Sequence, residues 1–336
     1  MRMEIPKTEE LAEQVFSISH IADFQKTALA IFRYQYYHNP VYQSYCNLLQ
    51  SPPDNVKAPE DIPFLPISFF KTHTVVTTAF QPEVIFESSG TTGVATSRHY
   101  VKEKALYEKS FRTAFNLFYG PASEYCILGL LPSYLERGQS SLVYMVADLV
   151  QESRHPLSGF YLYDFNSLAS TLAQLEAAGQ KTLLIGVTYA LLDFAAQYPM
   201  TLKHTQIMET GGMKGRKKEL VRSEVHAQLK QAFGLSHIHS EYGMTELLSQ
   251  AYAAAEGRFF TPPWMKVIIR EEDDPLSVSK ASSSGGINIM DLANLHSCAF
   301  IATEDVGRLH ADGSFEVLGR LDNAGIRGCS LLVTGL

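Results

Sequence analysis

The spacing of hydrophobic residues changes along the chain and divides it into segments of different structure. Near the N-terminus, Ile21, Phe24 and Leu29 recur at close to 3.6 residues, the period of an amphipathic helix. This spacing predicts helix over residues 8–50, with a break where Asn39 precedes a proline. The chain therefore begins as a helical lobe.

From residue 84 onward, short apolar runs alternate with amphipathic helical segments. The predicted strands cover residues 84–86, 125–131, 159–165, 182–187 and 205–210. One intervening helix ends at Gly120, which precedes a proline, and another ends at Gly179. Strands and helices alternating at these lengths predict an α/β fold, with a largely parallel sheet that is covered by helices.

The last part of the sequence is expected to be β-rich. Strands are predicted at residues 264–270, 286–290, 298–303 and 314–318, with a turn at 311–313. The whole pattern predicts four units, a helical N-terminal lobe packed on the core at 1–83, an α/β core at 84–258, a β-rich subdomain at 259–318, and a hinge and tail at 319–336.

Composition narrows the class of protein. With 46% hydrophobic and 19% charged residues in a chain of 336, disordered, collagenous and coiled-coil classes are excluded. The net charge of −7 provides no overall positive field for nucleic acid. No apolar run reaches the ~20 residues that a membrane span needs, and the N-terminus lacks the apolar core of a secretory signal, so a cytoplasmic protein is expected.

The four cysteines form no CxxC pair, which argues against a disulfide framework and against a zinc site. Cys46, Cys126 and Cys298 have apolar neighbours and are predicted to be core residues. Cys329 stands near the end of the sequence, seven residues before residue 336.

A run of hydroxyl residues and glycines follows the predicted strand at 84–86. It consists of Ser88, Ser89, Gly90, Thr91, Thr92 and Gly93. The lysine and the helix of a Walker loop are missing, but glycines allow close backbone approach to a phosphate, and hydroxyl and N–H groups can donate to its oxygens. A polar turn between two strands explains the same residues equally well.

A second candidate segment runs from Tyr242 to Glu246. A tyrosine beside Gly243 can stack on a flat base, Thr245 can donate to a phosphate, and Glu246 can hold Mg²⁺. The alternative is an ordinary helix start, with Thr245 and Glu246 as solvated polar residues.

A third candidate combines Asp305 with the segment 319–322, which contains Arg320. A carboxylate at the end of a strand can accept both ribose hydroxyls, and an arginine fork suits phosphate. Taken singly, either piece is better explained as turn residues.

These segments, in this order, resemble the adenylate-forming superfamily of acyl-CoA synthetases, luciferases and peptide-synthetase adenylation domains. The matching motifs are Ser89–Gly93, Tyr242–Glu246, Asp305 before a Val-Gly pair, and the Gly-Arg-x-Asp at 319–322. Gly211 and Gly212 are similar to the paired glycines beside adenine in this family. The resemblance implies ATP as cosubstrate, Mg²⁺ on Glu246, and catalytic roles for Thr245 and Arg320.

The sequence departs from the superfamily pattern in two places. The Pro-Lys pair that usually continues the phosphate loop is replaced by residues 94–98, which end in Arg98. Family members also continue past the Gly-Arg-x-Asp hinge into a mobile domain that carries an adenylation lysine. That domain is expected to be absent here, so the role of its lysine is assigned to no residue.

The segment Arg327-Gly328-Cys329-Ser330-Leu331 is similar to the acyl-protein synthetase of the bacterial luminescence fatty-acid reductase complex. This resemblance implies activation of a fatty acid as acyl adenylate, capture by Cys329 as a thioester, and delivery to a partner reductase. Arg327 can favour the Cys329 thiolate electrostatically. Two alternatives remain open, a phenylacetate-type acyl-CoA ligase, and a nucleotide-binding protein without catalysis.

Overall fold

The computed structural model describes residues 8–88, 96–131, 139–211, 220–271, 276–277 and 284–321. The helices are α1 (Thr8–Phe16), α2 (Ile21–His38), α3 (Pro40–Leu48), α4 (Phe69–Thr72), α5 (Lys104–Tyr119), α7 (Ser141–Ser153), α8 (Phe165–Ala177), α9 (Thr188–Gln197) and α10 (Arg222–Phe233), with 3₁₀ turns η1 (Pro59–Asp61) and η2 (Ala122–Glu124). The strands are β1 (Leu65–Pro66), β2 (Val84–Glu87), β3 (Arg98–Val101), β4 (Cys126–Leu130), β5 (Gly159–Phe160), β6 (Thr182–Val187), β7 (Thr205–Thr210), β8 (His239–Tyr242), β9 (Ala251–Ala253), β10 (Met265–Arg270), β11 (Ser284–Asp291), β12 (Phe300–Leu309) and β13 (Phe315–Arg320).

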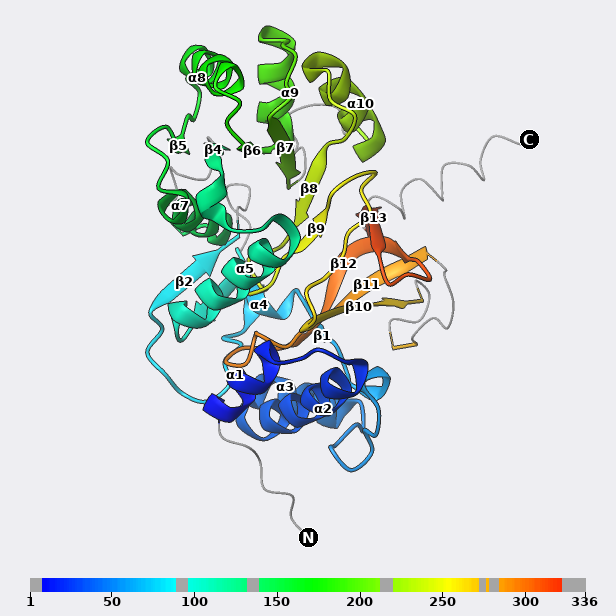
Figure 1. Cartoon of the computed structure of the whole chain (residues 1–336). Helices are drawn as coiled ribbons and strands as arrows, with labels where there is room; N and C mark the ends of the chain where they lie inside the picture. The colour runs from blue at the N-terminus through cyan, green and yellow to red at the C-terminus, as the bar shows by residue number, and fades with distance from the viewer. Residues whose placement is uncertain are drawn as a thin grey trace, which may run out of the picture.

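A six-stranded sheet forms the α/β part of the molecule. Its order is β5-β4-β6-β7-β8-β9, with parallel pairing from β5 to β8 and an antiparallel last strand. Helix α7 contacts β4, and α9 contacts β6 and β7. Figure 1 shows α8, α9 and α10 together at one end of the molecule, over this sheet. The α/β fold predicted from the alternation of elements is confirmed.

A second sheet has the order β1-β12-β11-β10, and β13 also pairs with β12. All its pairings are antiparallel except that of β1 with β12, where Leu65 lies opposite Ile301. The helices α1 to α3 lie next to this sheet (Figure 1). The ring of Tyr42 on α3 stacks on Phe300 of β12 at 6.1 Å between centroids. The first eighty residues thus share a core with the C-terminal strands.

The strands at 182–187 and 205–210 lie where the sequence predicts them, and Gly120 ends α5 with a φ of 84°. The predicted strand at 159–165 is wrong beyond residue 160. The backbone of Leu162 is left-handed, with a φ of 47°, and Asp164 caps α8 by accepting a hydrogen bond from the Ser167 amide at 3.0 Å. The N-terminal helix also breaks once more, between α1 and α2.

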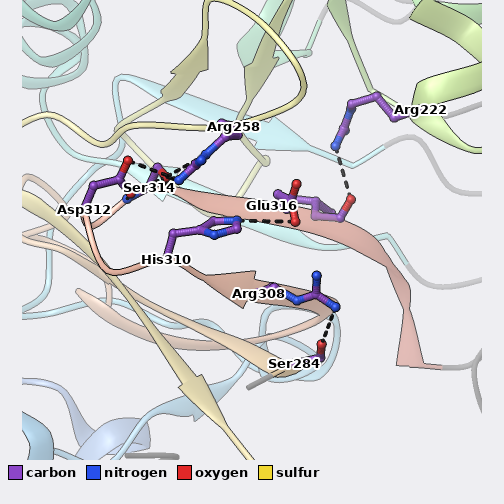
Figure 2. A network of polar contacts seen from close by, with 9 residues as sticks. Arg222, Arg258, Ser284, Arg308, His310, Asp312, Ser314 and Glu316 are labelled. Carbon is purple, nitrogen blue, oxygen red and sulfur yellow. Dashed lines mark hydrogen bonds and ion pairs between the residues drawn. The ribbon is translucent and has the colours of Figure 1, made fainter. Parts of the chain in front are cut away.

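Polar contacts hold β13 in place beside β12 (Figure 2). Arg258 Nη2 lies 3.1 Å from both carboxylate oxygens of Asp312 and 2.8 Å from the Ser314 hydroxyl. From the other sheet's helix α10, Arg222 donates to the carbonyl of Val317 at 3.2 Å. These contacts fix the path of the strand that ends at Arg320.

Candidate active site

Two of the predicted nucleotide-binding segments lie where parallel strands end. Gly211 follows β7, and the segment from Tyr242 to Glu246 begins at the last residue of the neighbouring strand β8. Open α/β sheets bind ligands at this carboxyl edge. Gly211 is exposed in a left-handed conformation with φ of 71°, and its carbonyl accepts a hydrogen bond from the Thr188 hydroxyl at 2.7 Å.

Ser88 and Ser97, on either side of the hydroxyl-rich segment, are joined by two hydrogen bonds. The Ser88 amide donates to the Ser97 carbonyl at 3.0 Å, and the Ser97 amide donates to Ser88 Oγ at 2.9 Å. Arg98 pairs with Glu87 across the β2–β3 hairpin at 3.3 Å. The predicted residues Ser89, Gly90, Thr91, Thr92, Gly93, Gly212 and Cys329 lie outside the described residues.

Tyr242 and Asp305 are joined although 63 residues separate them in the sequence. The Tyr242 hydroxyl donates to Asp305 Oδ2 at 2.8 Å, and the tyrosine ring lies 5.5 Å from that of Phe315. Burial raises the pKa of both groups, and Arg320 opposes the rise at Asp305. The aromatic and the carboxylate of the predicted nucleotide site therefore form one unit.

Arg320 lies directly opposite Asp305 in the β12–β13 register. Its Nη2 is 2.5 Å from Glu304 Oε2, and Lys71 Nζ on α4 is 3.9 Å from the other oxygen of that carboxylate. Glu304 thus sits between two cations at the edge of the site. A phosphate that entered here could compete with Glu304 for both of them.

Glu246 is almost buried, with 5% of its surface exposed. Burial raises the pKa of its carboxyl, while a hydrogen bond from Ser97 and the charge of Lys71 act in the opposite direction. Thr245 beside it is half-buried, in a turn rather than at a helix start. The two residues thus belong to a defined turn next to the base of the hydroxyl loop.

The residues of this edge fit a magnesium ion held jointly with a nucleotide. In the described part of the chain, no group of three or more His, Cys, Asp or Glu side chains could hold a metal by itself. Mg²⁺ is usually bound by one or two carboxylates together with substrate phosphates. Glu246, whose carboxyl interacts with Ser97, is the residue that the sequence predicts for that task.

The structure adds four residues that the sequence motifs did not single out as site residues, namely Lys71, Ser97, His99 and Asn294. Ser97 directly precedes β3, and His99 is the second residue of that strand. A polar residue at every second position directly after the hydroxyl loop is the sequence signal for this pair. Asn294 carries no local signal.

Three cysteines are confirmed as core residues, since Cys46, Cys126 and Cys298 are fully buried. Burial raises the pKa of all three thiols, that of Cys46 to about 12. His239 lies 3.3 Å from the Tyr119 hydroxyl through Nδ1, and burial lowers its pKa to about 4. Arg222, at the start of α10, pairs with Glu209 at 2.8 Å.

Glu241, directly before Tyr242, gives a prediction on stability. Burial raises the pKa of its carboxyl from 4.5 to about 7, against a hydrogen bond from Thr210. The folded protein therefore binds this proton more tightly than the unfolded chain does. The protonated Glu241 carboxyl makes its full contribution to the free energy of unfolding below pH 4.5. This contribution is lost as pH rises through 7, which lowers the free energy of unfolding by up to about 3 kcal/mol.

Thermal unfolding of the wild type and of Glu241→Gln, measured from pH 5 to pH 8, checks this expectation. The glutamine variant should gain several degrees relative to the wild type over that range, about 2 °C or more per kcal/mol. Taking the difference between the two proteins cancels the opposite contribution of buried histidines such as His99 and His296. If the unfolding temperatures of the two proteins changed in parallel with pH, the raised pKa of Glu241 would be contradicted.

The sequence profile of the family described as "Acyl-protein synthetase, LuxE" matches residues 16–116 and 140–335. No curated protein sequence matches the chain. In the described part of the chain, no helix has both the length and the apolar character of a membrane span.

Two solved structures are similar in fold. An open conformation of 2-hydroxyisobutyryl-CoA ligase in complex with 2-HIB-AMP and CoA has a TM-score of 0.63 and 11% identity, over 96% of this chain and 75% of the ligase. ATP-bound MatB from Rhodopseudomonas palustris has a TM-score of 0.55 and 16% identity, over 70% of this chain. The match covers 47% of the MatB chain, so the present chain spans about half of that protein's length. At these identities the likeness establishes the fold.

Proposed function

Because the chain belongs to the LuxE acyl-protein synthetase family, we propose that it is a ligase that activates a carboxylic acid with ATP as an acyl adenylate. We further propose that the acyl group then passes to Cys329. The observation that carries the proposal is the extent of the family match, which includes the motif at Tyr242–Glu246, Asp305, Arg320 and the cysteine of the tail.

In the first step, a carboxylate oxygen of the acid attacks the α-phosphorus of ATP. The bond to the bridging oxygen breaks, and pyrophosphate leaves. Negative charge grows on the phosphate oxygens, where donors fixed in advance are most effective. The hydroxyls of Ser89, Thr91, Thr92 and Thr245 supply such donors in this proposal.

The remaining site residues bind and orient the nucleotide. Glu246 would hold Mg²⁺, which when bound would neutralise charge on the phosphates. The Tyr242 ring and the backbone at Gly211–Gly212 face the base, Asp305 accepts from the ribose, and Arg320 leaves Glu304 for a phosphate. Support for this arrangement comes from the Tyr242–Asp305 hydrogen bond and from the register that sets Arg320 opposite Asp305.

In the second step, the Cys329 thiolate attacks the acyl carbonyl carbon, AMP leaves, and a thioester remains on the protein. Arg327 favours the thiolate, and the flanking Gly328 allows the tail to approach the site. A thioester retains the acyl group in a transferable form. We propose a fatty acid as the substrate, an acyl reductase as the partner that takes the acyl group, and the cytoplasm as the location.

Intact-protein mass spectrometry tests both steps. The protein is incubated with ATP, Mg²⁺ and single fatty or aryl acids, with and without CoA. We expect a hydroxylamine-labile acyl adduct on the wild type and on Ser330→Ala, the matched control in the tail. The adduct should be undetectable on Cys329→Ser, which should still form AMP slowly through release of its adenylate.

Other outcomes would replace the proposal. Acyl-CoA and AMP without an adduct would identify an acyl-CoA ligase, in which Cys329 has no role. ATP binding without pyrophosphate release in any mixture would identify a nucleotide-binding protein. An adduct that persists on Cys329→Ser would place the acceptor thiol elsewhere.

A further inference from the structure

We propose that His99 is a positioning residue that fixes the Thr245–Glu246 turn relative to β3, the strand that follows the hydroxyl-rich segment. By doing so it sets the affinity for ATP and the rate of adenylate formation. The part concerning rate rests on the proposed function, whereas the part concerning ATP affinity requires only that the site binds the nucleotide.

His99 stands on β3, the strand that leaves the hydroxyl loop, and only 1% of its surface is exposed. Its Nδ1 lies 2.8 Å from the carbonyl oxygen of Thr245, 146 residues away in the sequence. A carbonyl oxygen can only accept, so Nδ1 carries the hydrogen. This bond ties the strand after the loop directly to the backbone of the turn.

Asn294, which lies between β11 and β12, completes the connection from a third segment. Its Nδ2 donates to the carbonyl of Glu246 at 2.8 Å, and its Oδ1 lies 3.1 Å from His99 Nε2. The Asn294 carbonyl in turn accepts from Gln35 Nε2 on α2 at 2.9 Å. The carbonyls of both turn residues are therefore held by buried side chains.

Two further contacts place the same histidine at the centre of the site. Ser97, directly before β3, lowers the pKa of the Glu246 carboxyl by a side-chain hydrogen bond. The Phe70 ring on α4 meets the His99 ring edge-on at 6.0 Å between centroids, and Lys71 follows Phe70. The short segment from Ser97 to His99 therefore contacts both the side chain and the backbone of the turn.

This arrangement has a direct consequence for the reaction. Donors aimed at a reacting phosphate lose their effect when they move by about 1 Å, and such displacements can cost about 100-fold in rate. Strand β3 and the turn come from distant parts of the chain, so their relative position depends on contacts between them. His99 supplies one such contact through its bond to the Thr245 carbonyl.

The test compares three substitutions of His99 with a matched control, all in the full chain. His99→Phe keeps the ring volume and removes both nitrogens, His99→Asn restores a donor at the position of Nδ1, and His99→Gln places an amide at the position of Nε2 without replacing the Nδ1 donor. The control is His296→Phe, another buried histidine, which is 6% exposed and whose Nε2 lies 3.6 Å from Glu103 Oε1. The measurements are the Kd for ATP by titration, KM and kcat for AMP formation, and the unfolding temperature.

We expect His99→Phe to raise the Kd for ATP about tenfold and to lower kcat/KM by about 10- to 100-fold. His99→Asn should recover more of the ATP affinity than His99→Gln, because only the former restores the bond to Thr245. The control should lose similar thermal stability and keep its ATP parameters. Equal effects of His99→Phe and His296→Phe on ATP binding, or no recovery by asparagine, would overturn the proposal.

The two proposals fail separately. If the wild type binds ATP but forms no AMP with any acid, the proposed function fails, while the ATP titrations still decide the role of His99. If AMP forms normally in His99→Phe, the positioning role fails and the proposed function stands. A wild type that binds no ATP would overturn both.

Discussion

Glu246→Gln is expected to lower the rate of pyrophosphate release by about 100- to 1,000-fold at saturating ATP, the usual cost of removing one electrostatic group from such a site. The substitution keeps the volume of the side chain and an oxygen that can accept from Ser97. It removes the negative charge proposed to hold Mg²⁺ against the phosphates. Titration of the rate with Mg²⁺ should show a weaker dependence on the ion in the variant.

The same substitution should leave stability unchanged or improve it. Burial raises the pKa of the Glu246 carboxyl, so the charged form is disfavoured in the folded protein, and a neutral amide relieves this cost. An active variant would contradict the metal role, and an inactive variant with a lowered unfolding temperature would point to a structural defect instead. Glu256→Gln, at an exposed carboxylate paired with Lys230, is the control and should behave as the wild type.

Asp291→Ala is expected to lower the free energy of unfolding by about 3–5 kcal/mol, the largest effect on stability that we predict. Asp291 is completely buried, and its Oδ2 accepts from the backbone amides of Leu248 and Ser249 at 2.7 and 2.9 Å. Its Oδ1 accepts from the Ser249 hydroxyl at 2.6 Å. Truncation would leave buried donors without an acceptor, at about 1–3 kcal/mol each.

Urea denaturation followed by fluorescence measures this loss. Asp291→Asn retains one acceptor oxygen and should lose less than half as much as the alanine variant. Because the segment after Glu246 is held by these bonds, activity should fall together with the folded fraction. A loss below 1 kcal/mol for alanine would show that other groups replace the carboxylate.

The local patterns of the sequence predict many of the helices and strands but few of the contacts between them. The strand at 182–187 carries a nearly continuous apolar run that suits a sheet covered on both faces, and the structure confirms this strand and the one at 205–210. The run at 159–165 has similar composition, but the left-handed backbone of Leu162 and the cap at Asp164 end the strand early. Competition between strand propensity and capping is not decided by the apolar pattern alone.

In the candidate site too, local sequence patterns do not predict the long-range contacts. Motifs predict which side chains face a nucleotide, and Tyr242, Asp305 and Arg320 do lie together. The residues that hold the motifs in place are different, because their partners lie far away in the sequence. The bond from His99 to Thr245 spans 146 residues, and Asn294 reaches Glu246 from 48 residues away, so no local pattern reveals either contact.

The two-residue strand β1 delays folding of the N-terminal helices during synthesis of the chain. Leu65 pairs in parallel with Ile301, and Gln35 on α2 binds the backbone of Asn294 and Ala299. The N-terminal helices therefore cannot complete their core until Ile301 has left the ribosome. Contacts of such long sequence separation slow folding. During translation, the first helices will expose apolar surface for most of the elongation time, which makes this stage the natural point for chaperone binding.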